Sequence, residues 1–185
     1  MICVHAAVAL TAVYEISEDG RSAIGAVELE DAEDYFFFEV GLLGERIPAN
    51  VQNITLISRD ALCNPCNFSR EGSVLEFQKG NYTLTYAREV RDNHFIAVFE
   101  RPYDVEVILP SGLDVRNRLI GSISQGGVVT EEEGHLSIRW NNTRMAECRF
   151  YEPFREVLLM TFFTFLGVVA VVLFVPFLLT GRRRD

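Results

Sequence analysis

The apolar residues of this chain follow two different patterns, one over most of its length and another at its end. Between residues 14 and 154, short stretches alternate apolar and polar positions or are apolar throughout, and Gly, Asn, Asp or Pro separates them. A period of two residues is typical of β-strands, because successive side chains point to opposite faces. The last stretch, Val157 to Thr180, instead contains 24 residues without a formal charge. The patterns predict a β-domain followed by one long helix.

Turn signals divide the β-domain into strands. Glu18-Asp19-Gly20 predicts a hairpin, and Lys79-Gly80-Asn81 predicts another between the apolar residues on either side. Residues 95–99 are apolar at every position, as in a strand covered on both faces. About eight strands in a domain of this length predict an all-β fold, an antiparallel β-sandwich of immunoglobulin-like shape, over residues 14–154.

One predicted strand carries four aromatic residues in sequence, Tyr35-Phe36-Phe37-Phe38. Alternation places two of these rings on each face of the strand. Both pairs pack in a core in one interpretation. In the other, one pair packs in the core while the second contacts a partner, the membrane surface or a neighbouring loop.

The charge-free stretch is long enough to cross a membrane. A helix rises about 1.5 Å per residue, so the stretch reaches roughly 36 Å, whereas a hydrocarbon layer is about 30 Å thick. We expect a transmembrane helix over residues 155–181, and a helix buried in a protein core is the alternative. The tail 182–185 then contains Arg182, Arg183 and Arg184, which predict a cytoplasmic membrane anchor.

Basic residues lie close to both ends of this helix, so their distribution alone does not set its orientation. Four sequons of the form Asn-x-Ser/Thr lie upstream, at Asn53, Asn67, Asn81 and Asn141. Chance gives roughly one such match in a chain of this composition, and accidental matches are the alternative to true acceptors. The sequons favour a single-pass glycoprotein of the cell membrane with its N-terminal domain outside and its C-terminus in the cytoplasm.

The first 13 residues, MICVHAAVALTAV, are mostly apolar. They resemble the apolar part and the exit of a signal peptide but lack the basic residues that normally precede it. Residues 1–13 are therefore either the remnant of a signal peptide or the first strand of the domain.

The formal net charge of the chain is −9, which argues against a nucleic-acid partner. The apolar stretch contains no ionisable group, so a lone helix of this kind does not transport ions. The partners that we expect are the lipid bilayer and a protein or another component of the cell envelope.

Cys63-Asn64-Pro65-Cys66 is the most specific local motif. The spacing is shared with thioredoxin-like dithiols, but no amphipathic helix or βαβ pattern accompanies it. A structural disulfide between Cys63 and Cys66 is the main interpretation, and a redox pair, free thiols or half of a metal site are the alternatives. Cys148 lies on an inward face, as a buried thiol does. We expect no catalytic residue, no metal site and no cofactor.

Two stretches, RDNHFIAVFERPYDVEVILPSGLDVRNRLIGSISQGGVV and RFYEPFREVLL…VPFLLTGRRRD, carry a resemblance to known sequences. They resemble an uncharacterised family of membrane-anchored proteins from methanogens and salt-tolerant archaea, classed as a domain of unknown function. The resemblance covers most of the chain. It implies an extracytoplasmic domain with a C-terminal anchor and no established activity.

These observations together predict a non-enzymatic cell-surface protein. We expect a membrane-anchored β-sandwich that acts as a binding or structural module, or as an accessory subunit of an envelope assembly. The alternative is an extracytoplasmic thiol-redox or metal-binding protein that uses Cys63 and Cys66.

Overall fold

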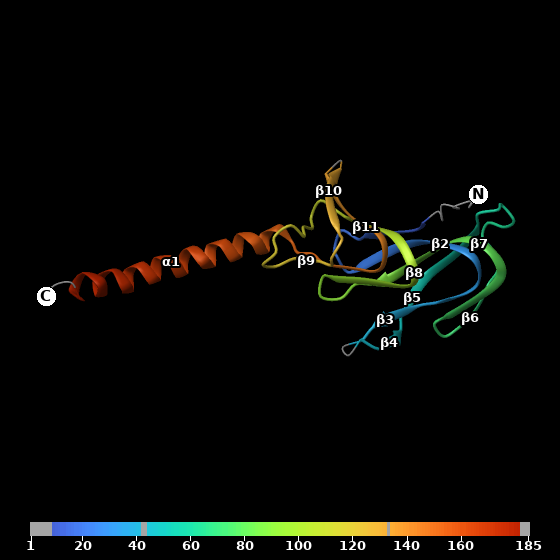
Figure 1. Ribbon diagram of the computed structural model, residues 1–185, viewed down its shortest axis with the longest axis horizontal. Coiled ribbons are helices and arrows are strands. Elements are labelled where there is room, and N and C mark those ends of the chain that lie inside the picture. Colours follow the sequence, from blue (N-terminus) through green and yellow to red (C-terminus); the bar gives the residue numbers. More distant parts are fainter. Residues whose placement is uncertain (1–8, 42–43, 133, 182–185) are drawn as a thin grey trace, which may run out of the picture.

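The computed structural model of the chain describes residues 9–41, 44–132 and 134–181, with side chains described up to residue 174. This part of the chain forms a β-domain followed by one helix, α1, which spans Pro153–Gly181 (Figure 1). The strands are β1 (Leu10–Ile16), β2 (Ser22–Phe36), β3 (Phe38–Val40), β4 (Arg46–Pro48), β5 (Val51–Ser58), β6 (Ser69–Glu71), β7 (Val74–Glu89), β8 (His94–Leu109), β9 (Ser122–Ile123), β10 (Val128–Glu132) and β11 (His135–Arg149).

Nine of these strands form one sheet in the order β10-β11-β8-β1-β2-β7-β5, with β6 beside β7 and β9 beside β11. The remaining two strands, β3 and β4, form a separate antiparallel pair. The mostly β fold with a C-terminal helix is confirmed. One difference is that β1 and β8 run parallel, whereas the sequence predicts antiparallel neighbours only. The sheet is therefore mixed.

Four strands, β2, β7, β8 and β11, are 15 or 16 residues long and bend near their middle. The pairing register shifts between Leu29 and Asp34 where β2 meets β7, and between Trp140 and Met145 where β11 meets β8. Extra residues in one strand of a pair bend that strand and increase its twist. The bends therefore fold the single sheet back on itself.

The two halves of the folded sheet pack against each other as the layers of a sandwich. The ring of Tyr14 in β1 contacts that of Phe95 in β8, with centroids 4.8 Å apart. Arg88 Nη1 in β7 donates a hydrogen bond to the backbone carbonyl of Ile96 in β8 at 2.9 Å. The first half of β8 thus lies across β1 and β7. The largest fully buried side chains of the core between the layers include Trp140, Tyr14, Phe95 and Phe150.

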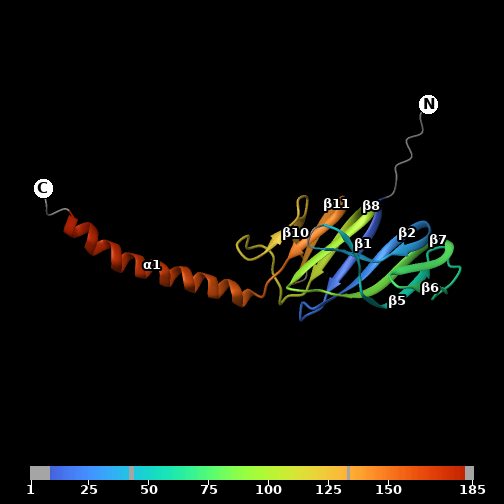
Figure 2. The same cartoon turned by 90° about the horizontal axis from the view of Figure 1, so that it is seen from below.

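The folded sheet gives the domain two distinct ends (Figure 2). At the helix-proximal end, the β1–β2 turn contacts the β7–β8 turn. Val90 N of the β7–β8 turn donates a hydrogen bond to the carbonyl of Arg21 in the β1–β2 turn at 2.8 Å. The β7–β8 turn also contacts the end of β11, where Phe150 N donates to the carbonyl of Asn93 at 3.0 Å. The bends of the four long strands lie at the opposite, helix-distal end.

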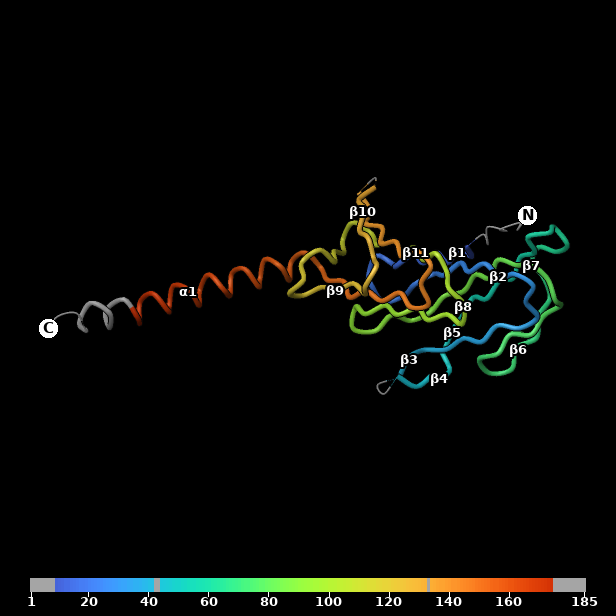
Figure 3. Tube along the Cα trace, in the orientation of Figure 1, coloured from blue at the N-terminus to red at the C-terminus, as the bar shows by residue number. Residues whose placement is uncertain are grey.

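The helix α1 continues almost directly from β11. Pro153 is its first residue, a position where the missing N–H costs nothing and the fixed φ favours the helix. Figure 3 shows α1 leaving the domain as a projecting rod, with described loops of the domain beside its base only. Its apolar side chains, from Phe154 to Phe174, are accordingly exposed.

The structure contradicts one local prediction, a hairpin within β7, and tests another, the N-terminal segment, only in part. The hairpin expected at Lys79-Gly80-Asn81 is wrong: β7 runs unbroken through these residues and bends there, because β2 follows it and bends at the same level. In the N-terminal segment, residues 10–13 belong to β1, which lies inside the sheet between β2 and β8. Residues 1–8 of the possible signal peptide lie outside the described residues.

Candidate functional site

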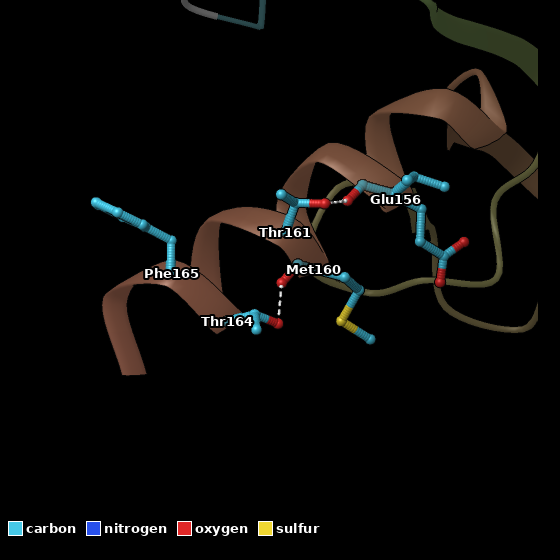
Figure 4. Close-up of a pocket in the computed structure, with 6 residues that line it drawn as sticks. Glu156, Met160, Thr161, Thr164 and Phe165 are labelled. Atoms are coloured by element: carbon cyan, nitrogen blue, oxygen red, sulfur yellow. Dashed lines mark hydrogen bonds between the residues drawn. The ribbon is translucent and has the colours of Figure 1, made fainter. Parts of the chain in front are cut away.

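The exposed helix is the first functional feature. Among the described residues, Pro153–Phe174 form the one helix long and apolar enough to cross a membrane, and none of its most apolar window is buried. Thr161 and Thr164 satisfy their hydroxyl groups within the helix, by donating to the carbonyls of Val157 and Met160 at 2.8 Å (Figure 4). The shallow depression along this face is lined by α1 alone, so it is helix surface and not a binding cavity.

A hydrogen-bonded junction joins α1 to the domain. The backbones of Asp114 and Tyr151 exchange two hydrogen bonds of 2.8 Å. Asn117 N donates to Tyr151 Oη at 3.0 Å, and Asn117 Nδ2 donates to Glu156 Oε1 at 3.0 Å. Glu156 lies in the first helical turn, where the helix dipole favours a carboxylate. Burial raises the pKa of the Tyr151 hydroxyl above its ordinary value. These contacts fix the direction in which the helix leaves the domain.

Asp114 organises the loop on which this junction depends. Its carboxylate accepts hydrogen bonds from Val115 N at 2.6 Å and from Arg116 N at 2.8 Å. It also pairs with the Arg116 guanidinium at 2.7 Å, and Arg116 in turn reaches Glu131 at 3.0 Å. Burial pushes the pKa of Asp114 up, but the hydrogen bonds from Arg116 and from the backbone outweigh it and hold this pKa below its ordinary value.

At the helix-distal end, a groove of about 520 Å³ opens between the bend of β2 and the bend of β8. Phe36 and Phe38 are among the residues that line it, and their rings stack on each other, with centroids 5.8 Å apart and planes 17° apart. The Arg46 guanidinium lies 4.6 Å from the Phe38 ring centroid and pairs with Glu100 at 3.0 Å. Acidic residues outnumber basic ones along the lining: Glu30, Asp31, Glu33, Asp34 and Glu100 against Lys79 and Arg101.

The other two aromatic residues of this run point into the core. Phe37 is buried, and its ring lies 5.0 Å from both the Tyr35 and the Tyr86 ring centroids. Of the two interpretations of Tyr35-Phe36-Phe37-Phe38, the structure thus supports the one with a core pair and an outward pair. The outward pair contacts the neighbouring β4 through Arg46.

Cys63 and Cys66 form a disulfide in the loop after β5. Cys66 is buried, and its N–H donates to the carbonyl of Leu56 at 2.7 Å, while the carbonyl of Cys63 accepts from Ser58 N at 3.1 Å. The loop is thereby tied to the strand that precedes it. The next element after the pair is the strand β6 and not a helix, and no group of three or more potential metal ligands occurs in the described ranges. Cys148 is a buried free thiol, as its inward position predicts.

The four sequons occupy different environments. Asn53 and Asn141 are exposed at register shifts of β5 and β11, and Asn67 is exposed after the disulfide loop. Asn81 is half-buried, and its Nδ2, the atom to which an N-glycan would be attached, donates to Asp60 Oδ2 at 3.2 Å. It lies within β7 and not at a hairpin tip. The anchor residues Arg182, Arg183 and Arg184 lie outside the described residues.

Comparison with known protein families agrees with this architecture. A model described as a family of unknown function (DUF5803) matches residues 49–182, most of the chain. The chain belongs to the DUF5803 family. The DUF5803 match includes the disulfide loop, the junction and α1, so the helix is part of the family's own pattern. The expected membership in a family of unknown function is confirmed, and the archaeal origin stays a prediction. A comparison with curated proteins finds no match.

Sequence reasoning missed the junction. Asp114, Asn117 and Glu156 are ordinary polar residues without a recognisable spacing, and Asn117 and Glu156 lie 39 residues apart. The only local signal was Glu156, three residues after Pro153 and directly before the apolar stretch.

Proposed function

We propose that this protein is a non-enzymatic surface module, anchored in the cell membrane by α1 with its β-domain outside and its C-terminus in the cytoplasm. The domain acts as a binding module or as an accessory subunit of an envelope assembly. The observation that carries this proposal is the junction: a network of backbone and side-chain hydrogen bonds holds an exposed apolar helix at one end of an acidic domain. A fixed helix presents the opposite end of the domain away from the bilayer.

The helix-distal groove is the partner site in this proposal. The stacked rings of Phe36 and Phe38, which are partly exposed, supply apolar contact area, and the surrounding charges supply orientation and selectivity. Its place at the end remote from α1 keeps it clear of lipid headgroups.

The orientation is tested by protease protection of the full chain in sealed cells. External protease should remove the β-domain, and enzymatic deglycosylation should increase the mobility of the intact protein, because Asn53, Asn67 and Asn141 are exposed. A domain that is digested only after the cells are permeabilised would overturn the proposed topology.

The binding role is tested with a photoreactive phenylalanine analogue at Phe38, which lines the groove, in intact cells. The matched control places the same analogue at Val128, which is exposed on β10 and is not among the groove residues. We expect a discrete cross-linked product from position 38 and none from position 128. Equal products from both positions, or none from either, would contradict a partner site in the groove.

A thiol-redox role is the second candidate, and the Cys63–Cys66 disulfide is the observation that favours it. Alkylation after incubation with a graded thiol buffer distinguishes the two roles. A pair that stays oxidised under mild reduction supports a structural bond, whereas a pair that cycles readily supports the redox candidate.

A further inference from the structure

A second cleft, of about 860 Å³, lies at the helix-proximal end. The β1–β2 turn, the β7–β8 turn, the loop before β9, the end of β11 and the first turn of α1 all contribute to its wall. Figure 2 shows these turns gathered around the base of the helix. The cleft is therefore built from segments far apart in the sequence at the point where the chain leaves the domain.

Arginine dominates the charge of this cleft. Arg21, Arg91, Arg149 and Arg155 line it, against two carboxylates, Glu89 and Asp92. Arg91 pairs with Glu89 at 3.0 Å. The side chains of the other three arginines have no hydrogen bond or ion pair within the part of the chain that the structure describes. A chain with a net charge of −9 thus presents a locally positive cleft at this one end.

The position of the cleft relative to the apolar helix is defined by Arg155. This residue is the third of α1, and the charge-free stretch begins two residues later, at Val157. Two residues correspond to about 3 Å of helical rise, so the cleft opens at the level where hydrocarbon gives way to lipid headgroups. Leu119, which is 74% exposed, lies on the same wall and presents an apolar side chain at this level.

We propose that this cleft binds the phosphate of an anionic membrane lipid headgroup. Arginine guanidinium groups match phosphate geometry with paired hydrogen bonds, and unpaired arginines lose no internal partner when they bind it. The negative charge of the headgroup phosphate offsets part of the positive charge of the three unpaired arginines, while Leu119 contacts the upper part of the acyl chains. The proposal rests on the membrane anchoring proposed above, and it adds a specific lipid to the role of the helix.

The test uses the full chain reconstituted in vesicles of phosphatidylcholine containing one fifth phosphatidylglycerol. Enrichment of the anionic lipid around the protein is measured with spin-labelled phosphatidylglycerol and phosphatidylcholine. The variant R149Q/R155Q removes two arginines of the cleft. The matched control, R59Q/R144Q, removes the same charge from exposed arginines outside the cleft. Emission of Trp140, the single tryptophan, checks that each variant is folded.

We expect the unaltered chain to select the anionic lipid and the control to select it equally well. Selection should fall by roughly fivefold for each arginine removed from the cleft. Unchanged selection in R149Q/R155Q, or an equal loss in the control, would overturn the proposal. Binding of inorganic phosphate to the chain in detergent, together with no selection of phosphatidylglycerol in vesicles, would identify a site for free phosphate instead, and would also overturn it.

Flotation of the same vesicles separates this proposal from the one on which it rests. A chain that floats with the vesicles but shows no lipid preference refutes the lipid site alone. A chain that fails to float refutes the membrane anchoring, and the lipid site with it.

Discussion

Replacing Asp114 with alanine is the most direct test of how the domain holds its helix. The carboxylate of Asp114 accepts hydrogen bonds from Val115 N at 2.6 Å and from Arg116 N at 2.8 Å. It also accepts one from the Arg116 guanidinium at 2.7 Å. The substitution removes these acceptors but leaves the backbone bonds between residue 114 and Tyr151 in place. The loop that carries Asn117 should therefore loosen while the strands remain intact.

The expected cost follows from the burial of each partner. Val115 is 2% exposed, so its N–H is left without a partner, which costs about 1 to 3 kcal/mol. The guanidinium of Arg116 is half-exposed and is rehydrated, so the loss of its pairing adds only about 1 kcal/mol. Asp114→Ala should therefore lower the free energy of unfolding by about 2 to 4 kcal/mol.

The measurement is urea denaturation of the full chain in detergent micelles, followed by the fluorescence of Trp140, which is 1% exposed and reports loss of the core. The midpoint should shift by about 1 to 2 M at an unchanged slope. Glu100→Ala is the control, because Glu100 forms an exposed ion pair with Arg46 and should cost less than about 1 kcal/mol. An Asp114→Ala cost no larger than that of Glu100→Ala would refute the reasoning.

The same site gives a pH dependence. The pKa of Asp114 is lower in the folded protein than its ordinary value of 3.8, so its contribution is complete above that value and is lost as pH falls through the folded pKa. Asp114→Asn should therefore flatten the loss of stability on acidification below about pH 4. A residual slope is expected from Glu106, whose pKa is also lowered: burial raises it, but hydrogen bonds from Ser137 and Arg139 outweigh burial. An identical acid slope in the variant would contradict this assignment.

Three further predictions concern the core, the free thiol and one sequon. Gly25→Ala should cost about 1 to 3 kcal/mol in the same denaturation assay, because the new Cβ would lie 2.5 Å from the ring of the buried Tyr14; an unchanged midpoint would show that the ring moves freely. Burial raises the pKa of Cys148 to about 12, so iodoacetamide at pH 8 should modify it only after denaturation, as peptide mass spectrometry can check; rapid native labelling would contradict its burial. Asn81→Ala should cost about 1 kcal/mol and Asn67→Ala almost nothing, since only Asn81 has side-chain hydrogen bonds; equal midpoints would count against that role.

The parts of the fold that follow from local pattern were predictable from the sequence. The hairpin at Glu18-Asp19-Gly20 forms, because Gly20 takes a positive φ that the turn requires. The Cys63–Cys66 bond follows from a spacing of three residues. The apolar stretch gives the helix, because its length and lack of charge are properties of one segment.

The remaining features depend on contacts between distant segments, which no local pattern encodes. A strand that bends, as β7 does at Gly80, has the same sequence signature as two strands joined by a turn. The parallel pairing of β1 with β8 joins Leu10 to Tyr103, and alternation alone does not distinguish it from an antiparallel neighbour. Both clefts are lined by segments that these arrangements bring together, so the sequence alone does not identify their residues.

The direct passage from β11 into α1 has a mechanical consequence. A load applied through the helix reaches β11 at Arg149 and pulls the second half of this strand lengthwise against β8, with which residues 145 to 149 pair. Such a load shears many ladder bonds at once and does not unzip them one after another. The passage from β11 into α1 is therefore suited to resist tension along the helix axis.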